Sequence, residues 1–196
     1  MLAIPRSRRV RRFTQVTGGV VLFGVGHALM VESRLGLNPW QVLHEGVARR
    51  TGLTMGMVTI ATGLLVLAAW VPLDERIGIG TALNVALIGP TLDLTLWLLP
   101  TPDLALTRWV WLVAGILLTG VATGVYIGAG LGPGPRDGLM TGLAKRGITI
   151  RRVRTFIEVT VLALGWFLGG TVGVGTVLFA LAIGPIVQPA LRRWTI

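Results

Sequence analysis

The sequence contains no cysteine and few charged residues. Without cysteine the chain can form no disulfide, no thiolate metal site and no cysteine nucleophile. Charged residues make up 13% of the 196 residues, whereas a soluble domain carries roughly 25%. Acidic residues are fewer than basic residues, with 8 Asp and Glu against 18 Lys and Arg. Histidine occurs only at His27 and His44, so we expect no metal site.

Apolar residues fill the rest of the chain and predict an integral membrane protein. They make up 53% of the sequence, and the mean hydropathy is +0.76. The basic residues lie at the ends of apolar runs, so they indicate membrane topology rather than a nucleic-acid-binding face. No nucleotide-binding loop, metalloprotease pattern or serine nucleophile elbow occurs. We therefore expect neither a cofactor nor an enzymatic activity.

Six apolar stretches approach the roughly 20 residues that a helix needs to cross a bilayer. With six spans, most Lys and Arg fall on the side that holds both termini, and this side is expected to be cytoplasmic. The first stretch follows a basic segment but has no suitable cleavage site, so we expect an uncleaved first span. The six stretches are 13–33, 54–72, 79–99, 108–129, 153–171 and 174–191.

An internal repeat relates the two halves of the chain. Gly36, Pro39 and Leu43 recur 96 residues later, and the motif at 78–81 recurs at 173–176 as does Ile88-Gly-Pro90 at 183–185. Each copy holds three predicted spans, an odd number, so the second copy enters the membrane from the opposite side. This inverted-repeat plan is typical of secondary transporters. The expected divisions are a basic N-terminus at 1–12, repeats at 13–99 and 108–191, a linker at 100–107, and a C-terminal segment at 192–196.

Each copy has a glycine and proline hinge after its first span, followed by a short helix. Asn38 is a good N-cap and Pro39 suits the first helical position, and Gly134 with Pro135 take these places in the second copy. A helix of about twelve residues is ~18 Å long and cannot cross the bilayer. Either it lies at the membrane interface, or it dips inward and points its N-terminal N–H groups at a ligand. The fold class expected is therefore all-α, with six transmembrane helices in two inverted three-helix repeats.

Three segments of the second half carry a resemblance to a known family. They are Gly132-Pro-Gly-Pro-Arg-Asp-Gly-Leu-Met140, Val153-Arg-Thr-Phe-Ile-Glu158 and Gly169-Gly-Thr-Val-Gly-Val-Gly-Thr176. The chain resembles the YczE/YyaS/YitT family of bacterial integral membrane proteins, most closely its YczE-like branch. The resemblance implies a protein of the bacterial inner membrane and supplies no substrate or catalytic residue. The first copy has Trp40-Gln41 where the second has Arg136-Asp137, so this charged pair is not duplicated.

Arg136 and Asp137 are the leading candidates for function. An arginine presents a rigid fork of donors to a carboxylate or phosphate, and Asp137 would orient it or carry a proton. The alternative is a solvated or self-paired couple at the cytoplasmic interface. The full set of candidate substrate-binding residues is Arg136, Asp137, Gly132, Gly134, Asn38, Glu158 and His27.

The other candidates lie within predicted spans. Glu158 is an intramembrane carboxylate that carries a proton or simply pairs with Arg154, four residues earlier. His27 is either a hydrogen-bonded packing residue or a protonation switch. Asp93 and Gln188 hold equivalent positions in the third and sixth stretches, and line a central path or lie near the interfaces.

These features favour a small secondary transporter or permease for an anionic or zwitterionic solute. The alternative is a non-transporting scaffold or regulatory protein that acts through its helix faces, and a membrane-embedded enzyme ranks third. The partners expected are the lipid bilayer and a small solute, with no nucleic acid. The sequence leaves open whether the chain forms a homo-oligomer.

Overall fold

The computed structural model describes residues 6–195, with side chains from residue 9 onward. The expected N-terminal and C-terminal segments, 1–12 and 192–196, lie partly outside these residues. The described chain holds eight α-helices, one 3-10 turn and no strand, which confirms the all-α class. The elements are α1 (Arg6–Ser33), α2 (Pro39–Thr51), α3 (Met55–Ala68), η1 (Val71–Leu73), α4 (Ile79–Leu98), α5 (Ala105–Gly128), α6 (Pro135–Ala144), α7 (Ile150–Phe167) and α8 (Val174–Trp194).

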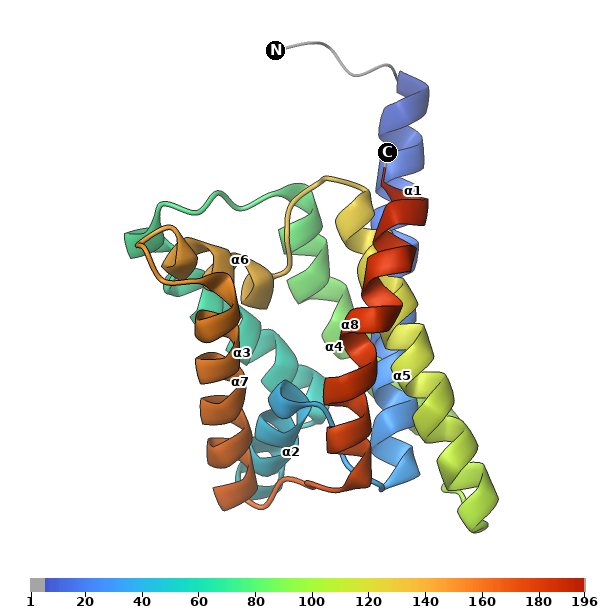
Figure 1. Cartoon of the computed structure of the whole chain (residues 1–196). Coiled ribbons are helices and arrows are strands. Elements are labelled where there is room, and N and C mark those ends of the chain that lie inside the picture. Colours follow the sequence, from blue (N-terminus) through green and yellow to red (C-terminus); the bar gives the residue numbers. More distant parts are fainter. Residues whose placement is uncertain (1–5, 196) are drawn as a thin grey trace.

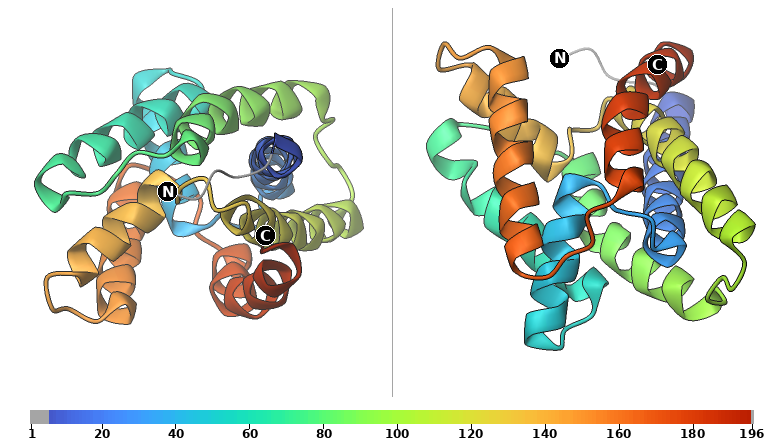
Figure 2. Two further views of the ribbon diagram at one scale, coloured as in Figure 1. Left: turned by 90° about the horizontal axis from the view of Figure 1, so that it is seen from above. Right: turned by 60° about the horizontal axis from the view of Figure 1, so that its bottom comes forward.

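The helices form two groups that lie side by side (Figures 1 and 2). One group holds the long helices α1, α4, α5 and α8, and the other holds the shorter helices α2, α3, α6 and α7. In the first group α1 packs along α5, with Gly26 of α1 against Gly115 of α5. Small residues let helix backbones approach closely in a membrane, where packing takes over from the hydrophobic effect.

Four helices are long and apolar enough to cross a membrane, namely α1, α4, α5 and α8. The pair α2 and α3, bent by 115° at the break between them, would make a fifth span if it is counted as one. The α3 helix alone has 14 residues, which gives a length of about 21 Å. The α7 helix has 18 residues but carries three arginines and Glu158. The arrangement of six spans therefore stays a prediction.

Large apolar side chains cover much of the outer surface. Leu65 of α3, Trp97 of α4, Leu106 of α5, and Phe156 and Phe167 of α7 are each more than 70% exposed. A soluble monomer rarely leaves so much apolar surface in water, whereas lipid tails accept it. The outer surface is therefore suited to contact with the lipid tails of a bilayer.

Each hinge receives the start of a helix from the other half of the chain. The Gly175 N–H of α8 donates to the Leu35 carbonyl of the first hinge at 2.8 Å, and the Gly80 N–H of α4 donates to the Leu131 carbonyl of the second hinge, also at 2.8 Å. These junctions lie at opposite ends of the molecule (Figure 1). Both hinges hold a glycine in a backbone conformation that other residues rarely adopt, Gly36 at φ +119° and Gly132 at φ +121°.

The two short helices begin as their sequences predict. The Asn38 side chain accepts a hydrogen bond from the Gln41 N–H at 3.1 Å, and Pro39 opens α2. Gly134 and Pro135 hold the same places in α6. Neither helix lies free on the surface, because α2 packs on α7 and α6 packs on both α7 and α3. Their first residues are thereby held in the interior, between the two groups of helices.

Candidate solute-binding cavity

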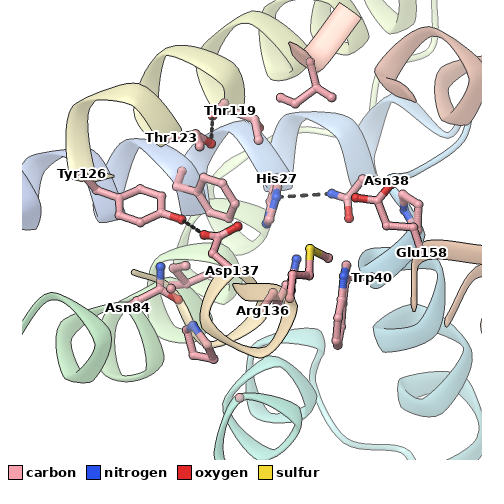
Figure 3. Close-up of a pocket in the computed structure, with 18 of the residues that line it drawn as sticks. His27, Asn38, Trp40, Asn84, Thr119, Thr123, Tyr126, Arg136, Asp137 and Glu158 are labelled. Atoms are coloured by element: carbon pink, nitrogen blue, oxygen red, sulfur yellow. Dashed lines mark hydrogen bonds between the residues drawn. The ribbon is translucent and has the colours of Figure 1, made fainter. Parts of the chain in front are cut away.

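A cavity of about 300 Å³ lies where the two groups of helices meet. Every one of the eight α-helices contributes to its wall, and the starts of α2 and α6 both reach it. The wall is largely apolar, and polar side chains from several helices reach it, among them His27 of α1, Asn84 of α4, Tyr126 of α5, Arg136 of α6 and Glu158 of α7 (Figure 3). A concave, mostly apolar site with a few converging polar groups is the usual form of a small-molecule site.

Arg136 supplies the positive charge at the centre of the cavity. It is the second residue of α6, and its guanidinium carbon lies 4.8 Å from the ring centroid of Trp40. Cation and ring attract each other at this distance. Among the described residues Arg136 has no hydrogen-bond or ion-pair partner, and it lies between Asp137 and Trp40 (Figure 3). The guanidinium is held by its face, while its N–H donors have no protein acceptor.

Asp137 is tied to α5 and not to its neighbour Arg136. The Tyr126 hydroxyl donates to Asp137 Oδ2 at 2.7 Å. Tyr126 is 3% exposed and belongs to the apolar cluster that α1 and α4 also form. The contact therefore fixes the start of α6 against the long helices.

His27 and Asn38 join α1 to the start of α2. The Asn38 Nδ2 and His27 Nε2 atoms are 3.2 Å apart, and both side chains are buried. On the far side of the same wall, Thr59 lies 2.9 Å from His44 Nδ1. Four buried polar atoms around the cavity have no partner among the described residues: His27 Nδ1, Trp40 Nε1, His44 Nε2 and Thr119 Oγ1. Buried polar groups are normally satisfied, so this concentration marks the cavity.

The mouth of the cavity lies between α7 and α8. On α7, Arg154 pairs with Glu158 at 2.8 Å, and the two side chains are 53% and 32% exposed. On α8, Gly184 and Gln188 line the cavity and are exposed. These helices follow each other in the chain but do not pack along each other, whereas their counterparts α3 and α4 do (Figure 1).

The structure brings six of the seven candidate residues to this cavity: Arg136, Asp137, Gly134, Asn38, Glu158 and His27. Gly132 lies outside its lining. A side chain at Gly132 would meet the Thr81 hydroxyl at 2.9 Å and the Gly78 Cα at 3.0 Å. The role of Gly132 that the structure shows is close packing at the second hinge, next to the cavity.

Asp93 and Gln188, which the repeat pairs, separate in the structure. Gln188 lines the cavity. Asp93 lies apart from it and accepts hydrogen bonds from the Gly56 N–H at 2.7 Å and from the Thr54 hydroxyl. A carboxylate in this place satisfies free N–H groups at the start of α3. Asp93 therefore stabilises the fold.

The described part of the chain matches a known family over almost its whole length. Residues 10–191 match a family of unknown function, DUF6198. The chain belongs to this family. An uncharacterized protein of Haemophilus influenzae is 42% identical over 85% of this chain and 77% of the relative. The uncharacterized membrane protein YczE of Bacillus subtilis is 34% identical over 96% of this chain and 89% of the relative.

A further relative supports the same assignment. The uncharacterized protein YyaS of Bacillus subtilis is 28% identical to this DUF6198 protein over 82% of each chain. These relatives confirm the resemblance to the YczE-like branch. Together with the four long apolar helices, they identify a multi-pass membrane protein. No solved structure matches the chain significantly.

Sequence reasoning missed the aromatic partners in the cavity of this DUF6198 protein. Tyr126 and Trp40 hold Asp137 and Arg136, yet an aromatic residue inside an apolar run gives no signal of its own. The repeat did contain a signal for Trp40, because Trp40 is the counterpart of Arg136 at a shift of 96 residues. In the structure these two counterparts meet in the cavity, where the Arg136 guanidinium contacts the Trp40 ring.

Proposed function

We propose that this protein is a small secondary transporter or permease of the bacterial cytoplasmic membrane, for an anionic or zwitterionic solute. The observation that carries the proposal is the guanidinium of Arg136, which has no ion-pair partner among the described residues and faces a central cavity. An uncompensated charge at membrane depth is costly and is a default functional candidate. A solute anion on Arg136 would compensate it.

The proposed architecture is six spans in two inverted repeats, with α3 and α7 as the two short spans. Support comes from the matched hinges, where each half docks the start of its last helix on the hinge of the other half with the same 2.8 Å hydrogen bond. Support also comes from the contact of Arg136 with its counterpart Trp40. Transporters of this plan bind solutes near the midplane, at helix breaks that belong to both repeats.

The mouth between α7 and α8 supports a carrier that opens to one side at a time. In an inverted-repeat carrier, the two halves exchange conformations as access alternates. The parted pair α7 and α8, next to the packed pair α3 and α4, is the asymmetry that such an exchange requires. We place the mouth on the cytoplasmic side, because its residues lie in the first half of α7 and the second half of α8. The start of α7 and the end of α8 lie toward the same end of the molecule as the start of α1 and the second hinge (Figure 1). No ATPase motif occurs, so an ion gradient or the solute gradient would supply the driving force.

Solute flux in liposomes tests the proposal. Purified protein is reconstituted and exposed to a mixture of small organic acids and amino acids, and the solutes retained after filtration are identified by mass spectrometry. We expect at least one acid or amino acid above the level of empty liposomes, and its loss in Arg136→Gln liposomes. Arg76→Gln is the matched control, because it removes the charge of an exposed arginine that lies outside the cavity lining.

The competing function is a scaffold or regulatory protein that acts through its helix faces. Two results together would reject the transporter in favour of this alternative. Wild-type liposomes would retain no solute above the level of empty liposomes, and the folded protein would co-purify with another membrane protein in fixed ratio.

A further inference from the structure

We infer that the ligand of the cavity is a small monocarboxylate with an apolar body, held by its carboxylate on Arg136. This inference rests on the proposed solute site and narrows its ligand from any anion or zwitterion to one chemical class. Four charged side chains line the cavity, and the pairing of each decides what charge a ligand can bring.

Arg136 is the single cation of the lining, among the described residues, that has neither a hydrogen-bond nor an ion-pair partner. Arg154 and Glu158 neutralise each other at 2.8 Å. The Arg136 guanidinium carbon lies over the Trp40 ring, and this contact uses none of the N–H donors of the fork. This fork matches the two oxygens of a carboxylate. Arg136 can therefore bind one planar anion, such as a carboxylate, in the cavity.

A zwitterion would need a second, negative anchor for its ammonium group. Both carboxylates of the cavity already accept a hydrogen bond from the protein, Asp137 from Tyr126 at 2.7 Å and Glu158 from Arg154. An ammonium group would have to share one of these carboxylates with its protein donor. The geometry thus disfavours amino acids relative to the matching carboxylic acids.

A dianion would bring one charge too many. Arg136 is the one cation of the described lining without an ion-pair partner, and Asp137 next to it would repel a second negative charge. A phosphate monoester or a dicarboxylate would therefore leave a buried charge uncompensated, which costs several kcal/mol per ion. A single available cation, Arg136, therefore favours a monoanion over a dianion.

The size of the cavity and its apolar side chains limit which group the carboxylate can be attached to. The cavity volume of about 300 Å³ lies at the lower end of the range for small-molecule sites, roughly 300–1,000 Å³. A chain or ring of modest size fits, and a peptide or whole lipid does not. Apolar side chains from α1, α4 and α8 face the same space: Phe23, Ile88, Phe179 and Ile183.

Cysteine protection in the full chain tests this inference, because the native sequence has no cysteine. The substitution Gln188→Cys places one thiol at the cavity mouth. The probes are phenylpropanoate, its neutral amide, its α-amino derivative phenylalanine, and phenylsuccinate as the dianion, with hexanoate and hexanamide as an aliphatic pair. The rate of maleimide labelling gives apparent affinities, and the melting temperature of the unmodified chain gives a second readout.

The two monocarboxylates should slow labelling and raise the melting temperature, and the other probes should act about tenfold more weakly or not at all. Arg136→Gln should weaken carboxylate binding roughly 10- to 100-fold, the factor expected for a charge-assisted hydrogen bond. Arg136→Lys should fall between the two, since it keeps the charge and loses the fork. Arg76→Gln, which removes an exposed arginine outside the cavity lining, should bind as the wild type does.

Three results would overturn the inference: amides that protect as well as carboxylates, phenylalanine or phenylsuccinate that binds more tightly than phenylpropanoate, or no effect of either carboxylate in both readouts. The test separates this inference from the proposed transport. Carboxylate binding without flux in liposomes would remove transport alone, and flux of neutral or cationic solutes alone would remove the monocarboxylate.

Discussion

At the scale of single residues, the packing of α1 on α5 depends on which glycine faces the neighbouring helix. Gly18 and Gly19 are adjacent in α1, but a Cβ at Gly18 would meet nothing within 4 Å. A Cβ at Gly19 would come within 2.8 Å of the Tyr126 backbone nitrogen. Backbone cannot move aside as a flexible side chain can, so α1 and α5 would have to separate at this point.

We expect Gly19→Ala to destabilise the protein by about 1–3 kcal/mol, the usual cost of overpacking. Gly18→Ala is the matched control and should be neutral or stabilising, because alanine favours a helix over glycine. The melting temperature of both variants in the same detergent measures the difference. Equal melting temperatures would contradict the close approach of the two helices. Since Tyr126 also holds Asp137, we further expect Gly19→Ala to weaken ligand binding.

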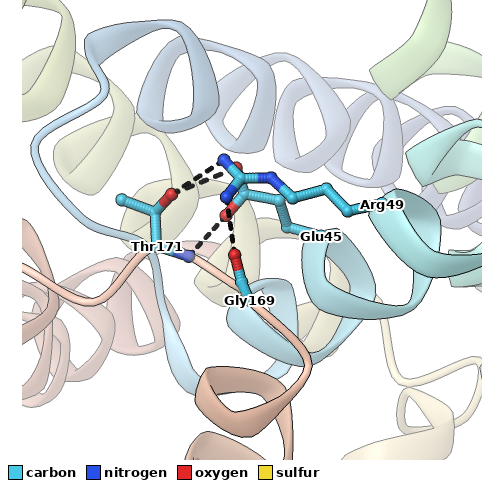
Figure 4. Close-up of polar contacts among 4 residues, drawn as sticks. All are labelled: Glu45, Arg49, Gly169 and Thr171. Atoms are coloured by element: carbon cyan, nitrogen blue, oxygen red, sulfur yellow. Dashed lines mark hydrogen bonds and ion pairs between the residues drawn. The ribbon is translucent and has the colours of Figure 1, made fainter.

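At the scale of elements, a cluster of polar contacts fastens α2 to the segment between α7 and α8 (Figure 4). Glu45 accepts a hydrogen bond from the Thr171 N–H at 2.6 Å and pairs with Arg49 at 2.6 Å. Arg49 in turn donates to the Gly169 carbonyl at 2.6 Å. Glu45 is only 14% exposed, so water competes weakly for these contacts. The start of α8 is thereby held near the first hinge.

At the opposite end of the molecule, the counterpart of Arg49 makes an equivalent connection. Lys145, which follows α6, pairs with Glu75 at 2.6 Å, and Arg146 donates to the Pro72 carbonyl at 2.5 Å. These contacts fasten α6 to the segment between α3 and α4. Each short helix is therefore joined to a connection of the other half of the chain.

Removing the carboxylate in Glu45→Ala should cost about 1.5–3 kcal/mol locally, the contribution of hydrogen bonds to a charged group. The Thr171 amide loses its acceptor, so its hydrogen exchange should become about tenfold faster or more. Hydrogen-exchange mass spectrometry of residues 168–173 measures this. Glu32→Ala is the control, because Glu32 accepts a single long contact of 3.5 Å from Thr101. Unchanged exchange in Glu45→Ala would show that Glu45 does not hold this segment.

At the scale of the whole molecule, hydropathy predicts the long helices well. The stretch 79–99 becomes α4 (Ile79–Leu98), and 174–191 becomes α8 (Val174–Trp194). The stretch 13–33 leaves out the basic first turns of α1, because a search for apolar runs does not detect a helical segment made of charged residues. The stretch 54–72 runs past the end of α3, since Trp70 to Leu73 form a 3-10 turn around Pro72.

The cavity could be predicted only in part from the sequence. Charge inside an apolar chain singled out Arg136, Asp137 and Glu158, and helix-capping chemistry singled out Asn38. Their convergence depends on tertiary packing, which brings together residues more than 100 positions apart, such as His27 and Arg136. The structural use of Asp93 at the start of α3 could not be predicted either, because its partners lie on another helix.

The side of the membrane on which each short helix ends decides whether the two halves are inverted. The native chain has no cysteine, so Thr51→Cys at the end of α2 and Ile148→Cys after α6 each create a single thiol at an exposed position. With both termini cytoplasmic, position 51 is outside and position 148 is inside. A membrane-impermeant maleimide should therefore label Thr51→Cys in intact spheroplasts, and Ile148→Cys only after the membrane is permeabilised.

Labelling of both variants from the same side would remove the inverted repeat, since an odd number of spans in each copy requires opposite sides. Labelling with both sides exchanged would keep the inverted repeat and reverse the orientation, which would move the mouth between α7 and α8 to the outer face. The experiment also fixes the direction from which a solute reaches Arg136 in this conformation. Position 148 directly precedes α7, and the first half of α7 lines the mouth. The mouth and position 148 are therefore expected on the same side of the membrane.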